Sequence, residues 1–201
     1  MSDMSEASPL LFLKDKNKAL YDLIRFLSEQ RFVDISGRPV LEVRDHEKPD
    51  DFVYGSHQTV IQIASRDLRV TFKSHFKLED ARRLTDRKKP LERSMKQVQK
   101  STYDLFMEYS NLVAGGISQH LHANGIVAGI SLPMATSGFD ELISSDSIKQ
   151  TSYFDYWRVL AEDFHFTCTV CVDILNEQRL GTLSFEKPET SAEDDSGLEI
   201  L

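Results

Sequence analysis

The sequence predicts an α+β protein of two layers, in which one long helix packs across a largely antiparallel sheet. Apolar residues recur at three- and four-residue intervals over residues 91–121, which is the pattern of an amphipathic helix. Apolar and polar residues alternate over residues 59–72 and again over residues 153–175, which is the pattern of strands with one buried face. In a chain of 201 residues, these patterns predict one helix layer and one sheet layer around a single core.

Turn and capping signals divide the chain before the long helix into short elements. Asn17 is a suitable N-cap for a first helix, and Ser36-Gly37-Arg38-Pro39 is a turn signal. The expected elements are a helix from Asn17 to about Glu29, two short strands within residues 32–43, a hairpin over residues 59–72 and a short helix over residues 78–85.

The long helix has an apolar side and a polar side. At about 100° per residue, Asp104, Glu108 and Asn111 fall within a strip about 60° wide on the polar side. We expect this strip to face solvent or a partner. The apolar side consists of Leu91, Met95, Val98, Leu105, Phe106, Tyr109, Leu112, Gly116 and Ile117, and the polar side of Gln97, Ser101, Asp104, Glu108, Asn111, Gly115 and Ser118.

Asn124-Gly125 ends the long helix, because glycine readily adopts the left-handed conformation of a helix C-terminus. Strand patterns dominate the chain after this point. The expected strands cover residues 126–133, 153–160, 164–175 and, after a turn at residues 176–178, 180–185.

Two cysteines, Cys168 and Cys171, have the C-x-x-C spacing of redox and zinc sites. They fall in a strand pattern, however, where residues three apart point to opposite faces. We therefore interpret Cys168 as a buried core residue and Cys171 as incidental, and we expect no metal site in this protein.

Charge and apolar content exclude several classes of protein. The net charge is -8, of which residues 186–201 contribute -5 with six acids and one lysine, which argues against nucleic-acid binding. No apolar run is long enough to span a membrane. The start of the chain is acidic and serine-bearing, unlike a secretory signal, so we expect a cytoplasmic protein. We expect disorder at residues 1–8, one domain over residues 9–185 and an acidic disordered tail over residues 186–201.

The polar strip of the long helix has two interpretations. A helix needs a solvated face, and carboxylates and amides supply one. Asn111 is a poor helix former, however, and Gly115 and Gly116 each cost about 1 kcal/mol relative to alanine. A helix that accepts these costs beside two carboxylates is also suited to close approach by another protein.

A cluster of basic residues precedes this strip and extends into the start of the long helix. It is either a solvated surface or a source of electrostatic steering toward an acidic partner. The cluster consists of Arg82, Arg83, Arg87, Lys88, Lys89, Arg93, Lys96 and Lys100.

The strip resembles the motif of the CheC/CheX/FliY phosphatases of bacterial chemotaxis. That motif is Asp or Ser, then Glu four positions later, Asn three positions after that, and Pro 22 positions after the Asn. Asp104, Glu108, Asn111 and Pro133 meet every spacing, and the glycines after Asn111 also resemble the family. The resemblance covers about thirty residues and implies a two-layer CheC/CheX-like α+β fold.

The resemblance also implies an activity, which is hydrolysis of the phosphoaspartate of a CheY-like response regulator. Asn111 would orient the attacking water and Glu108 would pair with the partner's active-site lysine, so both are expected catalytic residues. Asp104, Ser101 and Gly115 are expected to contact the partner. The required Mg²⁺ would belong to the response regulator, so we expect no cofactor in this chain.

The chain carries one copy of the motif, which resembles the single-motif CheX type and implies a homodimer. Two other functions are compatible with the same strip. A non-catalytic adaptor would bind a response regulator or flagellar-switch component through the same helix, and a structural domain would use the strip only as a solvated face.

Overall fold

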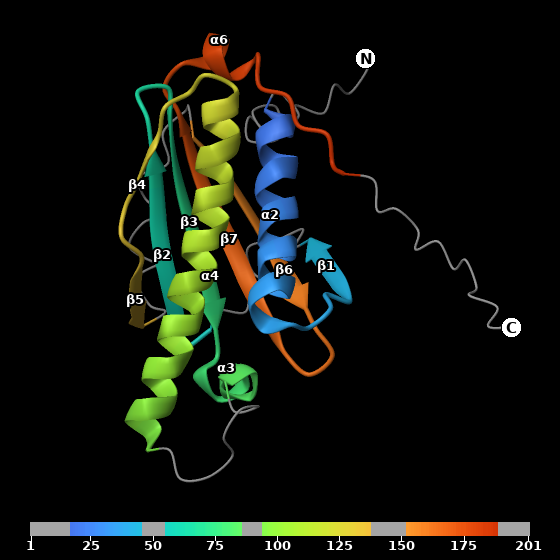
Figure 1. The fold of residues 1–201 in the computed structure, drawn as a ribbon, viewed down its shortest axis with the longest axis vertical. Coiled ribbons are helices and arrows are strands. Elements are labelled where there is room, and N and C mark those ends of the chain that lie inside the picture. Colours follow the sequence, from blue (N-terminus) through green and yellow to red (C-terminus); the bar gives the residue numbers. More distant parts are fainter. Residues whose placement is uncertain (1–16, 46–54, 86–93, 138–151, 189–201) are drawn as a thin grey trace, which may run out of the picture.

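Two helices, α2 (Lys18–Ser36) and α4 (Met95–Ala123), lie side by side across one face of an antiparallel sheet (Figure 1). The structure is a computed structural model that describes residues 17–45, 55–85, 94–137 and 152–188. Two short helices, α3 (Leu78–Thr85) and α6 (Glu177–Leu180), complete the helical elements of these ranges. The expected α+β architecture is therefore confirmed, with α2 as a second helix beside the long one.

The sheet has the strand order β1-β6-β7-β3-β2-β4, and β5 pairs with β2 on the same edge as β4. Every strand pair is antiparallel. The strands are β1 (Glu42–Asp45), β2 (His57–Ala64), β3 (Leu68–Phe76), β4 (Gly129–Ile130), β5 (Met134–Ser137), β6 (Ser152–Leu160) and β7 (His165–Ile174).

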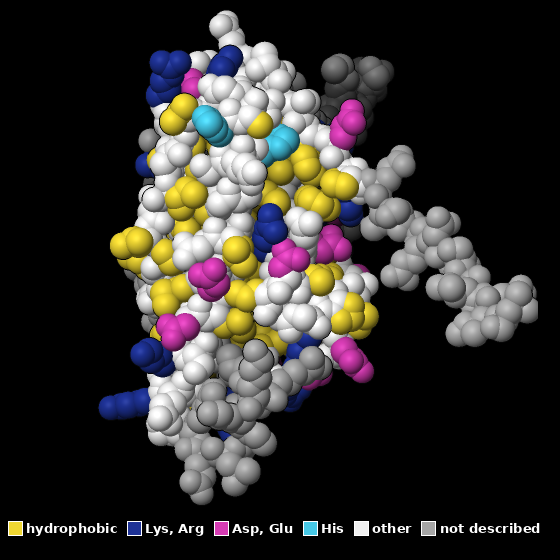
Figure 2. All heavy atoms as spheres, viewed as in Figure 1, with side chains coloured by type: hydrophobic (Ala, Val, Ile, Leu, Met, Phe, Trp, Pro, Cys, Tyr) yellow, Lys and Arg dark blue, Asp and Glu magenta, His cyan; other side chains and the backbone are white. Residues whose placement is uncertain are grey.

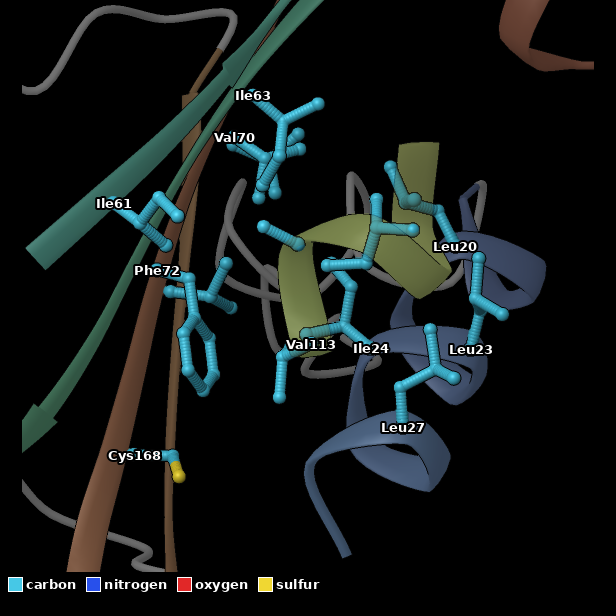
Figure 3. Packing of buried hydrophobic residues seen from close by; sticks show 14 of the residues in the cluster. Leu20, Leu23, Ile24, Leu27, Ile61, Ile63, Val70, Phe72, Val113 and Cys168 are labelled. Atoms are coloured by element: carbon cyan, nitrogen blue, oxygen red, sulfur yellow. The ribbon is translucent and has the colours of Figure 1, made fainter. Parts of the chain in front are cut away.

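The core lies between the helix layer and the sheet (Figure 3). Side chains at three- and four-residue intervals along α2 meet alternate side chains of β2 and β3, as the periods of helix and strand require. Val113 of α4 enters the same cluster, and Phe106 stacks on Phe76 with ring centroids 3.9 Å apart. The core residues that Figure 3 labels are Leu20, Leu23, Ile24, Leu27, Ile61, Ile63, Val70, Phe72, Val113 and Cys168.

Most elements agree with the sequence predictions. The hairpin is formed by β2 and β3, the short helix by α3, and the two long strands by β6 and β7. Asn124 is the C-cap of α4, and Gly125 has the expected positive φ of 73°. Cys168 is buried on the core face of β7 and Cys171 faces the other way, and the two form no disulfide bond.

The prediction for residues 32–43 was wrong in its first half. The first helix does not end near Glu29 but continues to Ser36, and Gly37 closes it with φ 63°. Phe32 continues the apolar face of α2 and is 2 % exposed, so burial in the core extends the helix past the expected end. Only the second strand exists, as β1.

Two predicted strands in the second half need correction. Residues 126–133 contain only the two-residue strand β4, and Pro133, which has no N–H to donate, lies in the break between β4 and β5. Residues 180–185 form no strand, and the Asn176 side chain instead accepts a hydrogen bond from the Arg179 N–H and caps α6. Leu183 is buried without strand pairing.

The start of α4 also differs from the prediction. Ser94 is the N-cap and forms a capping box with Gln97, so the first helical residue is Met95. Met95 was assigned to the apolar side, but its side chain is 65 % exposed. Leu91 lies outside the described residues, as do residues 1–8 and most of the acidic tail.

Within the described ranges, no helix is both long and apolar enough to cross a bilayer.

Candidate functional site

The candidate site is a row of side chains on the outer side of α4, which we call the stripe. Its members are Ser101, Asp104, Glu108, Asn111 and Gly115, all of which were singled out from the sequence. Asp104, Glu108 and Asn111 are exposed, and Ser101 and Gly115 are half-buried. Spacings of three and four residues place consecutive members on one side of the helix.

The three polar side chains at the centre of the stripe are not engaged by the rest of the protein. Asp104, Glu108 and Asn111 form no side-chain hydrogen bond or ion pair with any residue that the structure describes. Their hydrogen-bonding capacity therefore remains for solvent or a partner. The stripe presents two carboxylates and one carboxamide on a helix that is fixed by its opposite side.

A buried polar cluster fixes α4 over the sheet beneath the stripe. Thr59 Oγ1 lies 2.9 Å from Ser110 Oγ and 2.6 Å from Ser74 Oγ, and Ser110 also donates to the Phe106 carbonyl. These hydrogen bonds are directional, whereas apolar packing is not. They therefore determine which residues of α4 face the sheet. Because Ser110 faces the sheet, its neighbour Asn111 faces away from it.

A second hydrogen bond fixes α4 against α2. The Tyr109 hydroxyl donates to the Ser28 carbonyl at 3.0 Å, and the Trp157 indole N–H donates to Ser28 Oγ at 3.0 Å. Burial raises the pKa of Tyr109 well above its ordinary value, so this hydroxyl stays protonated as a donor. Tyr109 immediately follows Glu108, and the contact therefore helps to fix the side of α4 from which Glu108 projects.

The two consecutive glycines of α4 have different surroundings. A Cβ at Gly116 would lie 2.8 Å from Leu27 Cδ2, so glycine allows α2 and α4 to approach closely at this point. A Cβ at Gly115 would meet nothing within 4 Å. Leu27 therefore packs directly on Gly116, whereas the described chain leaves space for a side chain at Gly115, which belongs to the stripe.

Pro133 lies in the same part of the fold as the stripe. It directly precedes β5, in which Ala135 pairs with Thr59, and Thr59 contacts Ser110 of α4. The four motif positions, which span thirty residues of sequence, are thus gathered where α4 crosses the β2–β5 edge of the sheet.

Two basic residues extend the stripe toward the start of α4. Lys96 and Lys100 are exposed and precede Asp104 at four-residue spacing. Figure 2 shows Lys and Arg side chains at this end of α4, followed along the helix by Asp and Glu side chains. Arg83 instead donates to the Asp163 carbonyl at 3.1 Å, and Arg87, Lys88, Lys89 and Arg93 lie outside the described residues.

A shallow hollow adjoins the stripe and was not predicted from the sequence. Its volume is about 390 Å³, and it separates α4 from the segment that leads to β5. The only sequence signal is a run without charged residues over 123–137, and within it residues 126–133 were predicted to form a strand. The lining residues are Gly115, Ser118, Gln119, His122, Val127, Ala128 and Ile130.

Other groups capable of chemistry are buried elsewhere. Burial raises the pKa of the Cys168 thiol to about 12, which keeps it protonated and unreactive. Burial lowers the pKa of His75 to about 3, so its ring is neutral at ordinary pH. In the parts of the chain that the structure describes, no three His, Cys, Asp or Glu side chains gather where they would hold a metal ion.

Comparison with solved structures identifies the fold. No family model matches the sequence, and no curated protein matches it. A chain of the CheX–CheY–BeF3–Mg²⁺ complex from Borrelia burgdorferi has a TM-score of 0.60 at 15 % identity, over 76 % of this chain and 96 % of that chain. For CheX from Vibrio vulnificus, the TM-score is 0.57 at 14 % identity, over 76 % of this chain and 98 % of that chain. For FliY from Thermotoga maritima, the TM-score is 0.51 at 13 % identity, over 88 % of this chain and 96 % of that chain.

These likenesses confirm the class of fold that the motif implied, an antiparallel sheet covered by a long helix. The fold is that of the CheC/CheX/FliY proteins, and CheX structures are prominent among the similar ones. The likeness extends over three quarters of the chain and thus far beyond the thirty residues that carry the motif.

Proposed function

We propose that this protein is a CheX-like phosphatase that hydrolyses the phosphoaspartate of a CheY-like response regulator. The observation that carries this proposal is the exposed, unengaged pair Glu108 and Asn111 on one side of α4, in a CheX-like fold. The CheX chemotaxis protein of Borrelia burgdorferi was solved in a complex with CheY, BeF3 and Mg²⁺, which supports a response regulator as partner.

In this proposal, Asn111 enters the phosphorylation pocket of the partner and orients the attacking water. A carboxamide suits this role because its oxygen accepts from the water while its nitrogen donates to a neighbouring oxygen. Hydrolysis of a phosphoryl group depends mainly on positioning and electrostatics, which a fixed side chain of a second protein supplies. The helix that carries Asn111 is held by Ser110 and Tyr109, so the carboxamide is presented on a fixed support.

Glu108 lies one turn before Asn111 and is proposed to pair with the active-site lysine of the partner. This ion pair would set the register of the two proteins and admit Asn111 to the pocket. Asp104, Ser101 and Gly115 are proposed to contact the surrounding surface. The Mg²⁺ needed to neutralise phosphoryl charge is proposed to reside in the response regulator, so this chain supplies no metal ligand.

The test is phosphate release from the receiver domains of the host's response regulators, phosphorylated with acetyl phosphate in the presence of Mg²⁺. We expect Asn111→Ala to lower kcat by about 100-fold or more, because the water loses its orientation. Thermal unfolding should change little, since Asn111 is exposed. Gln178→Ala, which removes an exposed carboxamide from α6, is the matched control and should keep full activity.

An Asn111→Ala variant that still dephosphorylates its regulator at the wild-type rate would refute the catalytic assignment. Binding of phosphorylated regulators without hydrolysis by the wild-type protein would instead favour the adaptor. We also propose that the chain acts as a homodimer, as the single-motif CheX type implies. Sedimentation velocity of the full chain tests this separately.

A further inference from the structure

An apolar ridge runs alongside the stripe, on the segment that connects α4 to β5. We define the ridge as Val127, Ile130, Leu132 and Met134, whose side chains are 79 %, 43 %, 85 % and 62 % exposed. After α4 the chain turns back and follows β2, so the ridge runs antiparallel to α4 (Figure 1). Figure 2 shows hydrophobic side chains gathered along this margin of the face that carries α4.

The ridge is held firmly by the sheet. Two hydrogen bonds join Ser131 to Gln62. The Ser131 N–H donates to the Gln62 carbonyl at 2.9 Å, and the Gln62 N–H donates to Ser131 Oγ at 3.0 Å. Ser118 of α4 also donates to the Ala128 carbonyl at 3.4 Å. The exposed side chains therefore project from a fixed backbone, which is the arrangement of a preformed binding surface.

The hollow joins the ridge to the stripe. Gly115 of the stripe and Val127 and Ile130 of the ridge all line it. Asn111 lies about one helical turn before Gly115, so a protein seated over Asn111 lies next to the hollow and, beyond it, the ridge. The absence of a side chain at Gly115 leaves this path open, although the fold of the described chain would accept a Cβ there.

We infer that the ridge and the hollow form the second half of the docking surface for the response regulator, and that they contact apolar side chains bordering its phosphorylation pocket. This inference rests on the proposed function. A stable complex buries about 800 Å² on each partner, which is more than one carboxamide and two carboxylates supply. Exposed apolar surface beside a polar site is typical of the core of such an interface.

A second copy of this chain is a weaker candidate for the ridge. Sheet edges recruit a further strand through their free backbone groups, and Pro133 has no N–H and interrupts this edge between β4 and β5. The ridge therefore offers side chains to a partner more readily than it offers strand pairing.

The experiment compares two leucine variants of the full chain. Leu132→Glu places a charge on the ridge, and Leu41→Glu places the same charge at a leucine that is 65 % exposed next to β1, on the opposite edge of the sheet. The probes are the receiver domains of the host's response regulators. Binding is measured by calorimetry with receiver domains that carry Mg²⁺ and beryllofluoride, and phosphate release is measured with phosphorylated receiver domains. Leu132→Ser serves as a milder second variant, and thermal unfolding checks that each variant is folded.

We expect Leu132→Glu to raise both the dissociation constant and KM by about tenfold or more, with kcat within about twofold of wild type. Leu41→Glu should change none of these values by more than about twofold. If Leu132→Glu and Leu132→Ser bind and turn over like the wild type while Asn111→Ala is inactive, the ridge inference is overturned and the proposed function stands.

Other outcomes separate the two proposals further. If the wild type binds a receiver domain without hydrolysing it, the phosphatase proposal fails, and the dissociation constants of the variants still decide the ridge. If Leu132→Glu converts a dimer to a monomer without weakening regulator binding, the ridge belongs to a second copy and the inference is overturned. If the wild type binds no receiver domain, both proposals are overturned.

Discussion

The two sides of α4 are built in opposite ways. The side toward the sheet and α2 carries buried aromatic rings and hydroxyls, of which Tyr109 bonds to Ser28 and Ser110 to Thr59. The outer side carries Asp104, Glu108 and Asn111, which engage nothing in the described chain. One side therefore holds the helix in place, and the other presents side chains whose partners must come from elsewhere.

The comparison shows that the position of an exposed site is set from the buried side. Tyr109 and Ser110 lie between Glu108 and Asn111 in sequence, and their hydrogen bonds fix the rotation of the helix about its axis. At about 100° per residue, the two exposed residues are thereby directed outward together. Stability and function are thus expected to separate along one helix.

The largest expected effect on the buried side comes from Phe106→Ala. Phe106 is 1 % exposed and stacks on Phe76, so its loss leaves a cavity under α4 and should lower the free energy of unfolding by about 3–5 kcal/mol. Glu108→Ala, two positions further on the outer side, should change it by less than about 0.5 kcal/mol. Urea denaturation measures both, and similar losses for the two variants would contradict the comparison.

The sequence alone predicted which residues lie on the outer side of α4 better than it predicted where the helices and strands begin and end. The stripe follows from helical periodicity, which depends only on local spacing. The end of α2 depends on Phe32 reaching the core between α4 and the sheet, and that contact is not encoded in a local pattern. The apolar ridge was likewise read as a strand, because an uncharged run does not reveal whether its side chains are covered.

The roles proposed for Glu108 and Asn111 come from the motif rather than from periodicity. Helical spacing places two carboxylates and a carboxamide together but assigns them no chemistry. The fold adds what spacing cannot supply, because it brings Pro133, twenty-two residues after Asn111, to the edge where α4 crosses β2 and β5. The sequence gives no register between α4 and that edge, which is set by the Thr59–Ser110 contact.

The adjacent glycines provide a closer comparison, with a smaller expected effect. Alanine improves helix propensity equally at both positions, so the difference between the variants isolates the contact with Leu27. Leu27 is 6 % exposed, and a Cβ at Gly116 would approach its Cδ2 to 2.8 Å. We expect Gly116→Ala to be less stable than Gly115→Ala by about 1–3 kcal/mol in urea denaturation. Equal stabilities would show that α2 shifts to accommodate the methyl group.

The smallest expected effect comes from the basic end of the stripe. Lys96 and Lys100 are exposed and make no ion pair with the described part of the chain, so their field extends into solvent and would attract an acidic partner. If the partner is a response regulator, replacing both with alanine should lower the association rate by about two- to threefold at low ionic strength, with the dissociation rate unchanged. Stopped-flow measurements at several salt concentrations provide the rates.

Salt dependence distinguishes steering from direct contact at these two lysines. At 1 M salt the screening length falls to about 3 Å, so the wild type and the double variant should associate at the same rate. Arg66→Ala is the control, because Arg66 is 92 % exposed in the β2–β3 turn and lies far along the sheet from the start of α4 (Figure 1). A defect that persists at 1 M salt, or that appears mainly in the dissociation rate, would place the lysines inside the interface. The functional stripe would then begin one to two turns earlier on α4 than Asp104, on the same side of the helix.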